Sequence, residues 1–148
     1  MTTNIRSMTE EDVLDVLILA KEFSREAPST HKWDKNKTLL FLESALQMPN
    51  MEVFVYEKDG EIVGALVACM SEMYMSYKKM ATEFAWFVSK DARGTSTAIR
   101  LVKHFEEWAK QNGADYVTMS DIQGINNLSE LYKKMGYNSS EMTYLKEL

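Results

Sequence analysis

The sequence has few of the residues that build disulfide or metal-bound frameworks. Its 148 residues include one cysteine, Cys69, and two histidines, His31 and His104. A single cysteine excludes a disulfide framework and a cysteine-ligated metal site. The two histidines are far apart in sequence and lack the spacing of paired metal ligands. We therefore expect no metal site, and a reducing, cytoplasmic setting is the simplest interpretation of the lone cysteine.

Long apolar runs are also missing. No run approaches the roughly 18 residues of a membrane span, and no charged and then apolar leader opens the chain. The net charge of −5 argues against nucleic acid as the main partner, because phosphate backbones are bound by clustered lysine and arginine. We expect neither a membrane span nor a nucleic-acid site. A chain of this length is expected to form one domain, residues 1–148, around a single core.

Hydrophobic spacing predicts strands interleaved with helices. Thr9 and Asp34 are the expected N-caps of two early helices. A hairpin is expected at Asp59-Gly60, because this pair suits a type I′ turn. The expected strands are residues 4–8, 51–57, 62–70 with β-forming residues as far as 77, 80–88, 115–120 and 142–148. Two later helices are expected, one from the turn after Gly94 to residue 111 and one over 126–135. A mixed α/β fold, with a mostly antiparallel twisted sheet and helices on both faces, accommodates this order.

The stretch from Val88 to Val102 carries the clearest functional signal. An extended apolar run, residues 82–88, breaks there into a glycine turn that opens an amphipathic helix. The first N–H groups of a helix have no intrahelical partner, and together with the positive end of the helix dipole they bind anions such as phosphate. The surrounding basic residues are Lys90, Arg93, Arg100 and Lys103.

At these residues the chain resembles the GNAT N-acetyltransferase superfamily, whose Arg/Gln-x-x-Gly-x-Gly/Ala signature wraps the pyrophosphate of acetyl-CoA. The match fails at one position, where Ser96 replaces the usual inner glycine, and its Cβ restricts how closely a ligand approaches the backbone. The order of the remaining elements is also that of the family, so the resemblance covers essentially the whole chain. It implies that acetyl-CoA is bound by Arg93, Gly94, Thr95, Ser96, Thr97 and Ala98.

A second stretch, from Asn126 to Tyr137, resembles the family's Asn-x-x-Ala-x-x-Tyr-x-x-x-Gly-Phe/Tyr segment. The resemblance implies that Asn126 contacts the cofactor arm and that Tyr132 lies near the thiol leaving group. It also implies an oxyanion donor in a backbone N–H near Phe87 or Val88, where two parallel strands of the family splay apart. A homodimer is common among proteins of this kind.

The residues suggest roles of their own for two side chains. Strand alternation predicts that Glu83 shares a face with Ala85 and Phe87, where desolvation would raise its pKa and make it a base, directly or through water. Alternatively, Glu83 lies at the wet end of its strand. Tyr132 is either a general acid, because a phenol donates a proton, or a packed core tyrosine.

These features together predict an N-acetyltransferase that moves the acetyl group of acetyl-CoA to a primary amine by direct attack. The alternatives are a CoA-binding module without turnover and a protein-interaction module on the same fold. The acceptor is not identified by any motif, so a small amine, an antibiotic, an amino acid, a protein N-terminus and a lysine all remain open.

Overall fold

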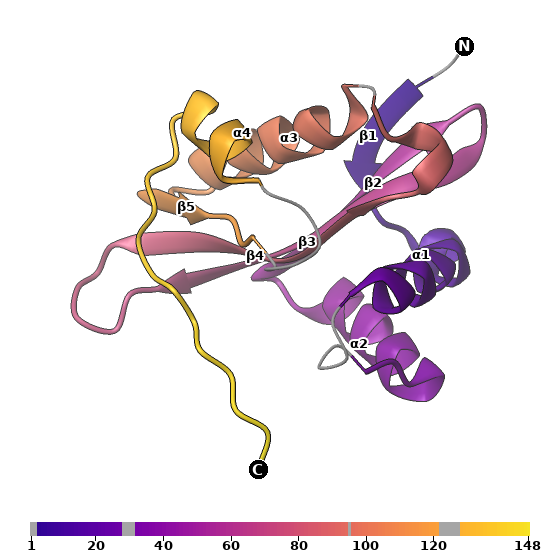
Figure 1. Cartoon of the computed structure of the whole chain (residues 1–148), viewed down its shortest axis with the longest axis horizontal. Helices are drawn as coiled ribbons and strands as arrows, with labels where there is room; N and C mark the ends of the chain where they lie inside the picture. The colour runs from indigo at the N-terminus through magenta and orange to yellow at the C-terminus, as the bar shows by residue number, and fades with distance from the viewer. Residues whose placement is uncertain (1–2, 28–31, 95, 122–127) are drawn as a thin grey trace.

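Five strands form one sheet in which neighbours along the chain are also neighbours in space, in the order β1-β2-β3-β4-β5 (Figure 1). This is seen in a computed structural model that describes residues 3–27, 32–94, 96–121 and 128–148. The strands are β1 (Thr3–Ser7), β2 (Met51–Lys58), β3 (Glu61–Glu72), β4 (Lys79–Val88) and β5 (Tyr116–Thr118). The helices are α1 (Val13–Glu26), α2 (Lys35–Gln47), α3 (Thr97–Gln111) and α4 (Ser129–Lys134), with short 3-10 turns η1 (Glu10–Asp12) and η2 (Lys90–Ala92).

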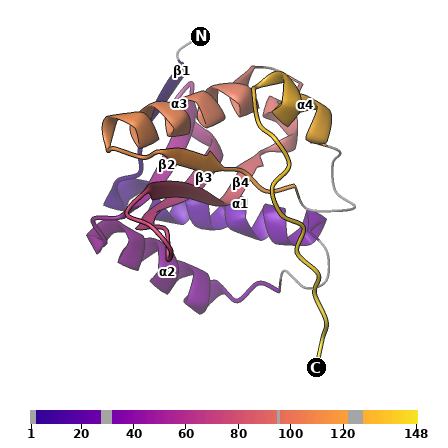
Figure 2. The same cartoon turned by 90° about the vertical axis from the view of Figure 1, so that its left-hand side faces the viewer.

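The helices cover both faces of the sheet. Figures 1 and 2 show α1 and α2 on one face and α3 and α4 on the other. Among the described strands, β4 and β5 run parallel to each other, and the other neighbours are antiparallel. The predicted fold class is therefore confirmed.

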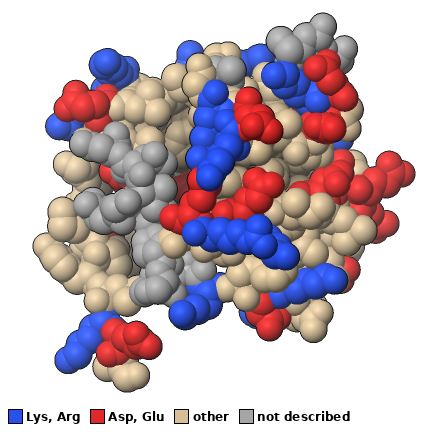
Figure 3. All heavy atoms as spheres, turned by 45° about the vertical axis from the view of Figure 1, so that its right-hand side comes forward, with Lys and Arg blue, Asp and Glu red and all other residues tan. Residues whose placement is uncertain are grey.

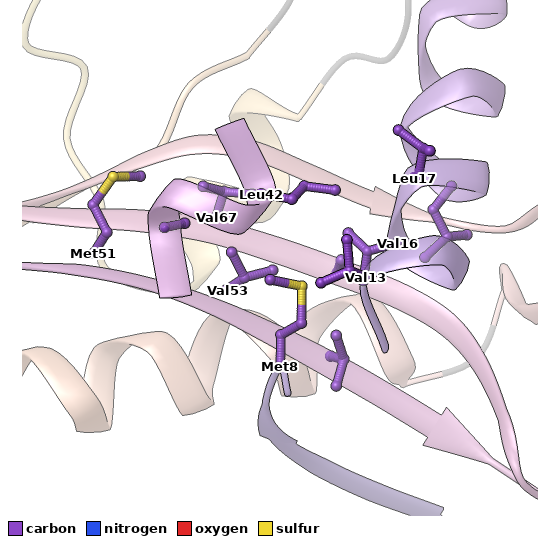
Figure 4. Close-up of a cluster of buried hydrophobic side chains, with 12 residues drawn as sticks. Met8, Val13, Val16, Leu17, Leu42, Met51, Val53 and Val67 are labelled. Atoms are coloured by element: carbon purple, nitrogen blue, oxygen red, sulfur yellow. The ribbon is translucent and has the colours of Figure 1, made fainter. Parts of the chain in front are cut away.

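Each face of the sheet has its own hydrophobic core. The core under α1 and α2 includes the side chains labelled in Figure 4, which are Met8, Val13, Val16, Leu17, Leu42, Met51, Val53 and Val67. The core under α3 centres on Leu66, Leu101 and Phe105, which are fully buried. Each large apolar side chain buried in this way contributes about 1.5–3 kcal/mol to folding. These cores fix the positions of β4 and α3, from which much of the candidate site is built.

Local signals place several elements where the sequence predicts them. Asp34 caps α2 by accepting a hydrogen bond from the Lys37 N–H at 2.9 Å. The β2–β3 hairpin turns at Asp59 and Gly60, whose φ angles of 51° and 82° are those of a type I′ turn. Both predictions are confirmed.

The start of α1 is held by an ionic cluster. Asp12 is buried, and its carboxylate accepts from Arg6 at 2.6 and 3.0 Å and from the Thr9 N–H at 2.8 Å. Arg6 also pairs with Glu57 at 2.6 Å. The bond from Arg6 is the main reason that the pKa of Asp12 is lowered to about 2. Asp12 thus ties β1 to the first turn of α1.

Asp12→Asn is expected to lower the free energy of unfolding by about 2 kcal/mol at pH 7, because it removes charge-assisted hydrogen bonds. Since the folded pKa is depressed, this contribution is present above pH 4 and is lost as the pH falls through about 2. Urea unfolding of parent and variant at pH 7 and pH 2 measures it. Asp15→Asn, an exposed change in the first turn of α1, is the control. Equal losses in the two variants would show that the Arg6 pair does not matter.

A β-bulge in β4 overturns one prediction. Val67 pairs with Ala85, but the next residue of β3, Ala68, pairs with Glu83, so Phe84 is an extra residue in β4. A bulge of this kind reverses the alternation of side chains. Glu83 therefore lies on the α3/α4 face, opposite to Ala85 and Phe87, and the prediction that these three share a face is wrong.

The C-terminal part of the chain has less regular structure than predicted. Residues 138–148 form neither helix nor strand, and their side chains are exposed, so the strand predicted over 142–148 is wrong. Figure 1 shows this tail running past the ends of β4 and β5. A strand needs a neighbour that is long enough to pair with it, and β5 has three residues. β3 also ends at Glu72 and does not continue to Tyr77.

Candidate functional site

The site lies where β4 and β5 stop pairing. Their parallel register runs from Met80 opposite Tyr116 to Thr82 opposite Thr118. β5 ends there, whereas β4 continues to Val88. Within the described residues, the second half of β4 has a strand neighbour in β3 alone. The sheet therefore opens along this edge of β4.

The backbone of Ser120, at the end of this opening, joins the two predicted catalytic residues through its N–H and its carbonyl group. The Ser120 N–H donates to Glu83 Oε2 at 2.9 Å, and the Ser120 carbonyl accepts from the Tyr132 hydroxyl at 2.7 Å. Glu83 comes from β4, Ser120 from the segment after β5, and Tyr132 from α4. The bulge at Phe84 makes this meeting possible because it places Glu83 on the α4 side of the sheet.

Burial changes the acid–base properties of both side chains. Glu83 is 6% exposed, and desolvation raises the pKa of its carboxyl to about 7, although the hydrogen bond from Ser120 opposes the shift. The pKa of Tyr132 is also raised, first by burial and then by the negative charges of Glu83 and Asp121. Near neutral pH the site therefore holds a carboxyl close to half ionised beside a firmly protonated phenol.

Two further residues border this pair, and the sequence motifs did not identify them. The Trp86 ring lies 6.2 Å from that of Tyr132. Trp86 Nε1 and Asp121 Oδ1 are both buried and have no hydrogen-bond partner in the described part of the chain. The other oxygen of Asp121 accepts from the Leu128 N–H at 3.3 Å. Strand alternation puts Trp86 on the face opposite to Glu83, so only the bulge at Phe84 brings the two to one face, and no local signal identifies Asp121.

Residues 93–98, the predicted binding site for the pyrophosphate of CoA, are called the phosphate loop below, and Gly94 forms its turn. Gly94 has a φ of +78°, which side chains rarely adopt, and a Cβ placed there would meet nothing within 4 Å. α3 follows, and its first described hydrogen bond runs from the Arg100 N–H to the Ser96 carbonyl at 2.9 Å. The Ser96 side chain makes no capping bond. The first N–H groups of α3 and the open space beside Gly94 thus suit an anion such as the pyrophosphate of CoA.

The backbone of β4 narrows the choice of oxyanion donor. The Ser89 N–H donates to Val63 of β3 at 2.9 Å, and successive N–H groups along a strand point to opposite sides. The Val88 N–H therefore points away from β3, towards the open edge, while that of Phe87 points towards β3. Of the two predicted donors, Val88 has the suitable direction.

Two of the predicted cofactor-binding residues, Thr95 and Asn126, lie outside the described residues. Thr97 is buried at the start of α3, and Ala98 is half-buried next to it. In the described ranges, no group of three or more His, Cys, Asp or Glu side chains could hold a metal ion. None of the described helices combines the length and the apolar character that a bilayer crossing requires.

Comparison with known proteins identifies the family. The model of the Acetyltransferase (GNAT) family matches residues 16–137. No curated protein sequence matches the chain.

Solved structures share the fold over the whole chain. AAC(6′)-Iy, solved with the bisubstrate analog CoA-S-monomethyl-acetylneamine, is 19% identical, with a TM-score of 0.81 and coverage of 100% of this chain and 99% of that one. Ribosomal-protein-alanine N-acetyltransferase from Brucella melitensis biovar Abortus 2308 is 15% identical, with a TM-score of 0.81 and full coverage of both chains. Glucosamine-6-phosphate N-acetyltransferase from Arabidopsis thaliana is 15% identical, with a TM-score of 0.77 and 99% coverage of both chains. Because the family model spans most of the chain, this protein belongs to the GNAT acetyltransferase family.

Proposed function

We propose that this protein transfers the acetyl group of acetyl-CoA to a primary amine by direct attack, and that the chain acts as one domain. The observation that carries the proposal is the backbone of Ser120, whose N–H and carbonyl groups hold Glu83 and Tyr132 together at the open edge of β4. Acetyl transfer needs a base, an oxyanion donor and a partner for the departing thiolate. Glu83, Val88 and Tyr132 offer one group for each need.

The binding of acetyl-CoA is assigned to the Gly94 loop and the start of α3. Backbone N–H groups there bind the pyrophosphate, and the open edge of β4 receives the arm that carries the thioester. The Val88 N–H then donates a hydrogen bond to the thioester carbonyl oxygen, which becomes negative as the amine attacks.

The remaining steps move two protons, form the C–N bond and break the C–S bond. The amine nitrogen bonds to the carbonyl carbon and loses a proton to Glu83. Because Glu83 is buried, we assign the transfer to an intervening water. The C–S bond then breaks, and its electron pair leaves with sulfur. Tyr132 stabilises the thiolate when its one hydroxyl hydrogen turns from the Ser120 carbonyl to the sulfur, and the thiolate finally takes a proton from solvent.

One observation favours the alternative of a CoA-binding module without turnover. Glu83 and Tyr132 both hydrogen bond to Ser120, as residues that merely fasten β5 and α4 to β4 would do. The two functions differ in a single assay. The protein is incubated with acetyl-CoA and a panel of amines, and the release of free thiol is followed. Amine-dependent release supports the transferase. CoA binding without release supports the module, and absence of both supports a protein-interaction role.

Gly94→Val is expected to weaken CoA binding about tenfold. An L side chain at φ +78° costs about 1–2 kcal/mol and displaces the loop that binds the phosphates. Calorimetric titration with CoA measures the change. Gly113→Val is the matched control, because Gly113 has a φ of +83° at the other end of α3 and equal free space. Both variants should lose stability, but only the first should lose affinity. Equal CoA affinity in the two variants would remove this loop from the site.

A further inference from the structure

The Arg93 side chain is fixed by contacts on three sides. Its Nε donates to the Val88 carbonyl at 2.8 Å, and its two Nη atoms donate to the two carboxylate oxygens of Glu26 at 3.0 and 2.5 Å. The centre of the guanidinium lies 5.0 Å from the centroid of the Phe87 ring. A guanidinium has five N–H donors, and this arrangement uses three of them. Within the described part of the chain, the other two donors of Arg93 make no hydrogen bond, and Arg93 is itself the first residue of the predicted phosphate loop.

Glu26 brings the end of α1 into this arrangement. It is the last residue of α1, 67 positions from Arg93 in sequence. Its carboxylate also lies 3.9 Å from the Lys90 ammonium. The hydrogen bond from Arg93 lowers the pKa of Glu26, so the carboxylate stays charged at neutral pH. Both side chains of this pair are therefore charged at neutral pH.

The geometry separates this pair from an ordinary surface salt bridge. Opposite charges meet elsewhere on the surface too (Figure 3), and most such pairs contribute little. Here the pairing is bidentate, and Val88 and Phe87 already hold the guanidinium. Less side-chain entropy is then lost when the ion pair forms. Val88 and Phe87 thus hold one side of the guanidinium, and Glu26 fixes the direction of its two Nη atoms.

An aromatic contact joins the same two segments. The ring of Phe23, one turn before Glu26, meets the ring of Phe87 edge to face at 5.8 Å. The end of α1 therefore packs on the end of β4 through an apolar contact and an ionic one. The ionic contact, from Glu26, is made to Arg93, the first residue of the phosphate loop. The apolar contact, from Phe23, is made to Phe87 in β4, outside that loop.

We propose that Glu26 is a positioning residue for the cofactor, which holds Arg93 so that its two remaining N–H donors serve a phosphate oxygen of CoA. This rests on the proposed function, because it assigns the phosphate loop to CoA. Without the carboxylate, Arg93 keeps one bond to Val88 but its Nη atoms are released. Part of the binding energy of CoA must then order the side chain again.

The test is calorimetric titration with CoA, combined with steady-state kinetics where the parent protein turns over. Glu26→Gln is expected to weaken CoA binding about fivefold and to raise the KM for acetyl-CoA by a similar factor, with kcat within twofold. Glu22→Gln is the matched control, since it removes the same charge one turn earlier on α1, and it should bind CoA within 1.5-fold of the parent. In an Arg93→Gln background, Glu26→Gln should have no further effect.

The outcomes separate the two proposals. Failure of the parent protein to bind CoA overturns the proposed function and this inference together. If the parent binds CoA and Glu26→Gln binds it within 1.5-fold of the parent, only the inference fails. It also fails if Glu26→Gln weakens binding equally in the Arg93→Gln background, because Glu26 would then act by another route. Thermal unfolding of each variant, measured in parallel, shows that titrations are made on folded protein.

Discussion

Glu83→Gln is expected to lower the rate of amine acetylation about 10³-fold at pH 7, within the usual range for loss of a general base. Glutamine keeps the shape of the side chain, and its amide oxygen can still accept the hydrogen bond from Ser120. Only the basic carboxylate is lost. In the parent, kcat/KM should rise with pH through about 7, the pKa to which burial raises Glu83. In the variant the rise of kcat/KM near pH 7 should vanish, and the rate should recover at high pH, where the amine itself loses its proton.

Asp115→Asn is the matched control for this experiment. Asp115 also bridges the two parallel strands, because its carboxylate accepts from the Lys79 N–H at 3.0 Å, but it lies at the exposed end of the pair. It should keep the parental rate and pH profile. If both variants lose activity equally, the carboxylates serve to hold β5. If neither pH profile differs from that of the parent, Glu83 is not the base.

The same variant makes a prediction about stability. The pKa of Glu83 is raised from 4.5 to about 7 in the folded protein, so its contribution to stability is full below pH 4.5 and is lost as the pH rises through 7. Glutamine has no such titration. Relative to the parent, Glu83→Gln should therefore gain about 3 kcal/mol in free energy of unfolding between pH 4 and pH 8. Urea unfolding across this range measures the difference, and a constant difference would show that the carboxyl is solvated.

The parts of the fold that the sequence predicts well depend on neighbouring residues. Asp34 caps a helix with the N–H three residues on, and Asp59-Gly60 closes a hairpin by its own backbone angles. The turn at Gly94 that leads into α3 belongs to the same class, since the glycine and the start of the helix are close in sequence. Such features need no knowledge of distant partners.

The bulge at Phe84 could not be predicted in this way. Phenylalanine is a common strand residue, and nothing in the run from Thr82 to Val88 marks one position as extra. The bulge becomes visible only through the register against β3, and it alone decides which face receives Glu83. The contact from Glu83 to Ser120 spans 37 residues, and that from Arg93 to Glu26 spans 67. Sequence reasoning therefore named candidate residues of the site but not their partners.

The predicted C-terminal strand failed for a related reason. The residues around Met142 and Tyr144 have strand-like composition, but Tyr144 and Leu145 are adjacent, which breaks the alternation that one buried face requires. In addition, the predicted strand 115–120 proved to be the three-residue β5. Composition alone could not show that the neighbouring edge is too short for pairing.

Tyr132→Phe is expected to lower kcat about 10²-fold, near the lower end of the range for general acid catalysis. The raised pKa of Tyr132 explains why the loss should not be larger. The thiol of CoA resembles that of cysteine, with a pKa of about 8.5, so complete proton transfer from this phenol to the thiolate is uphill. A hydrogen bond that strengthens as negative charge develops on sulfur remains favourable, and phenylalanine removes it.

The hydroxyl of Tyr132 also binds the Ser120 carbonyl, so a structural role must be distinguished from a chemical one. Tyr137→Phe provides the comparison. The Tyr137 ring lies 5.6 Å from that of Tyr132, and its hydroxyl donates to Glu106 at 2.7 Å. Each substitution deletes one partly buried hydroxyl and one hydrogen bond of 2.7 Å. The loss of stability should be about 1 kcal/mol for Tyr132→Phe, whose acceptor is a carbonyl, and about 1.5–3 kcal/mol for Tyr137→Phe, whose acceptor is a carboxylate.

Turnover should separate the two tyrosines. Tyr137→Phe should keep kcat within about twofold of the parent, whereas Tyr132→Phe should lose about 10²-fold, and both should bind CoA with nearly parental affinity because the rings remain. Single-turnover measurements ensure that the chemical step is compared, since slow product release would hide the loss. Equal rates for the two variants would leave Tyr132 as a residue that fastens α4 to β5. Departure of the thiolate would then depend on solvent alone, and the second motif would have no chemical role in this chain.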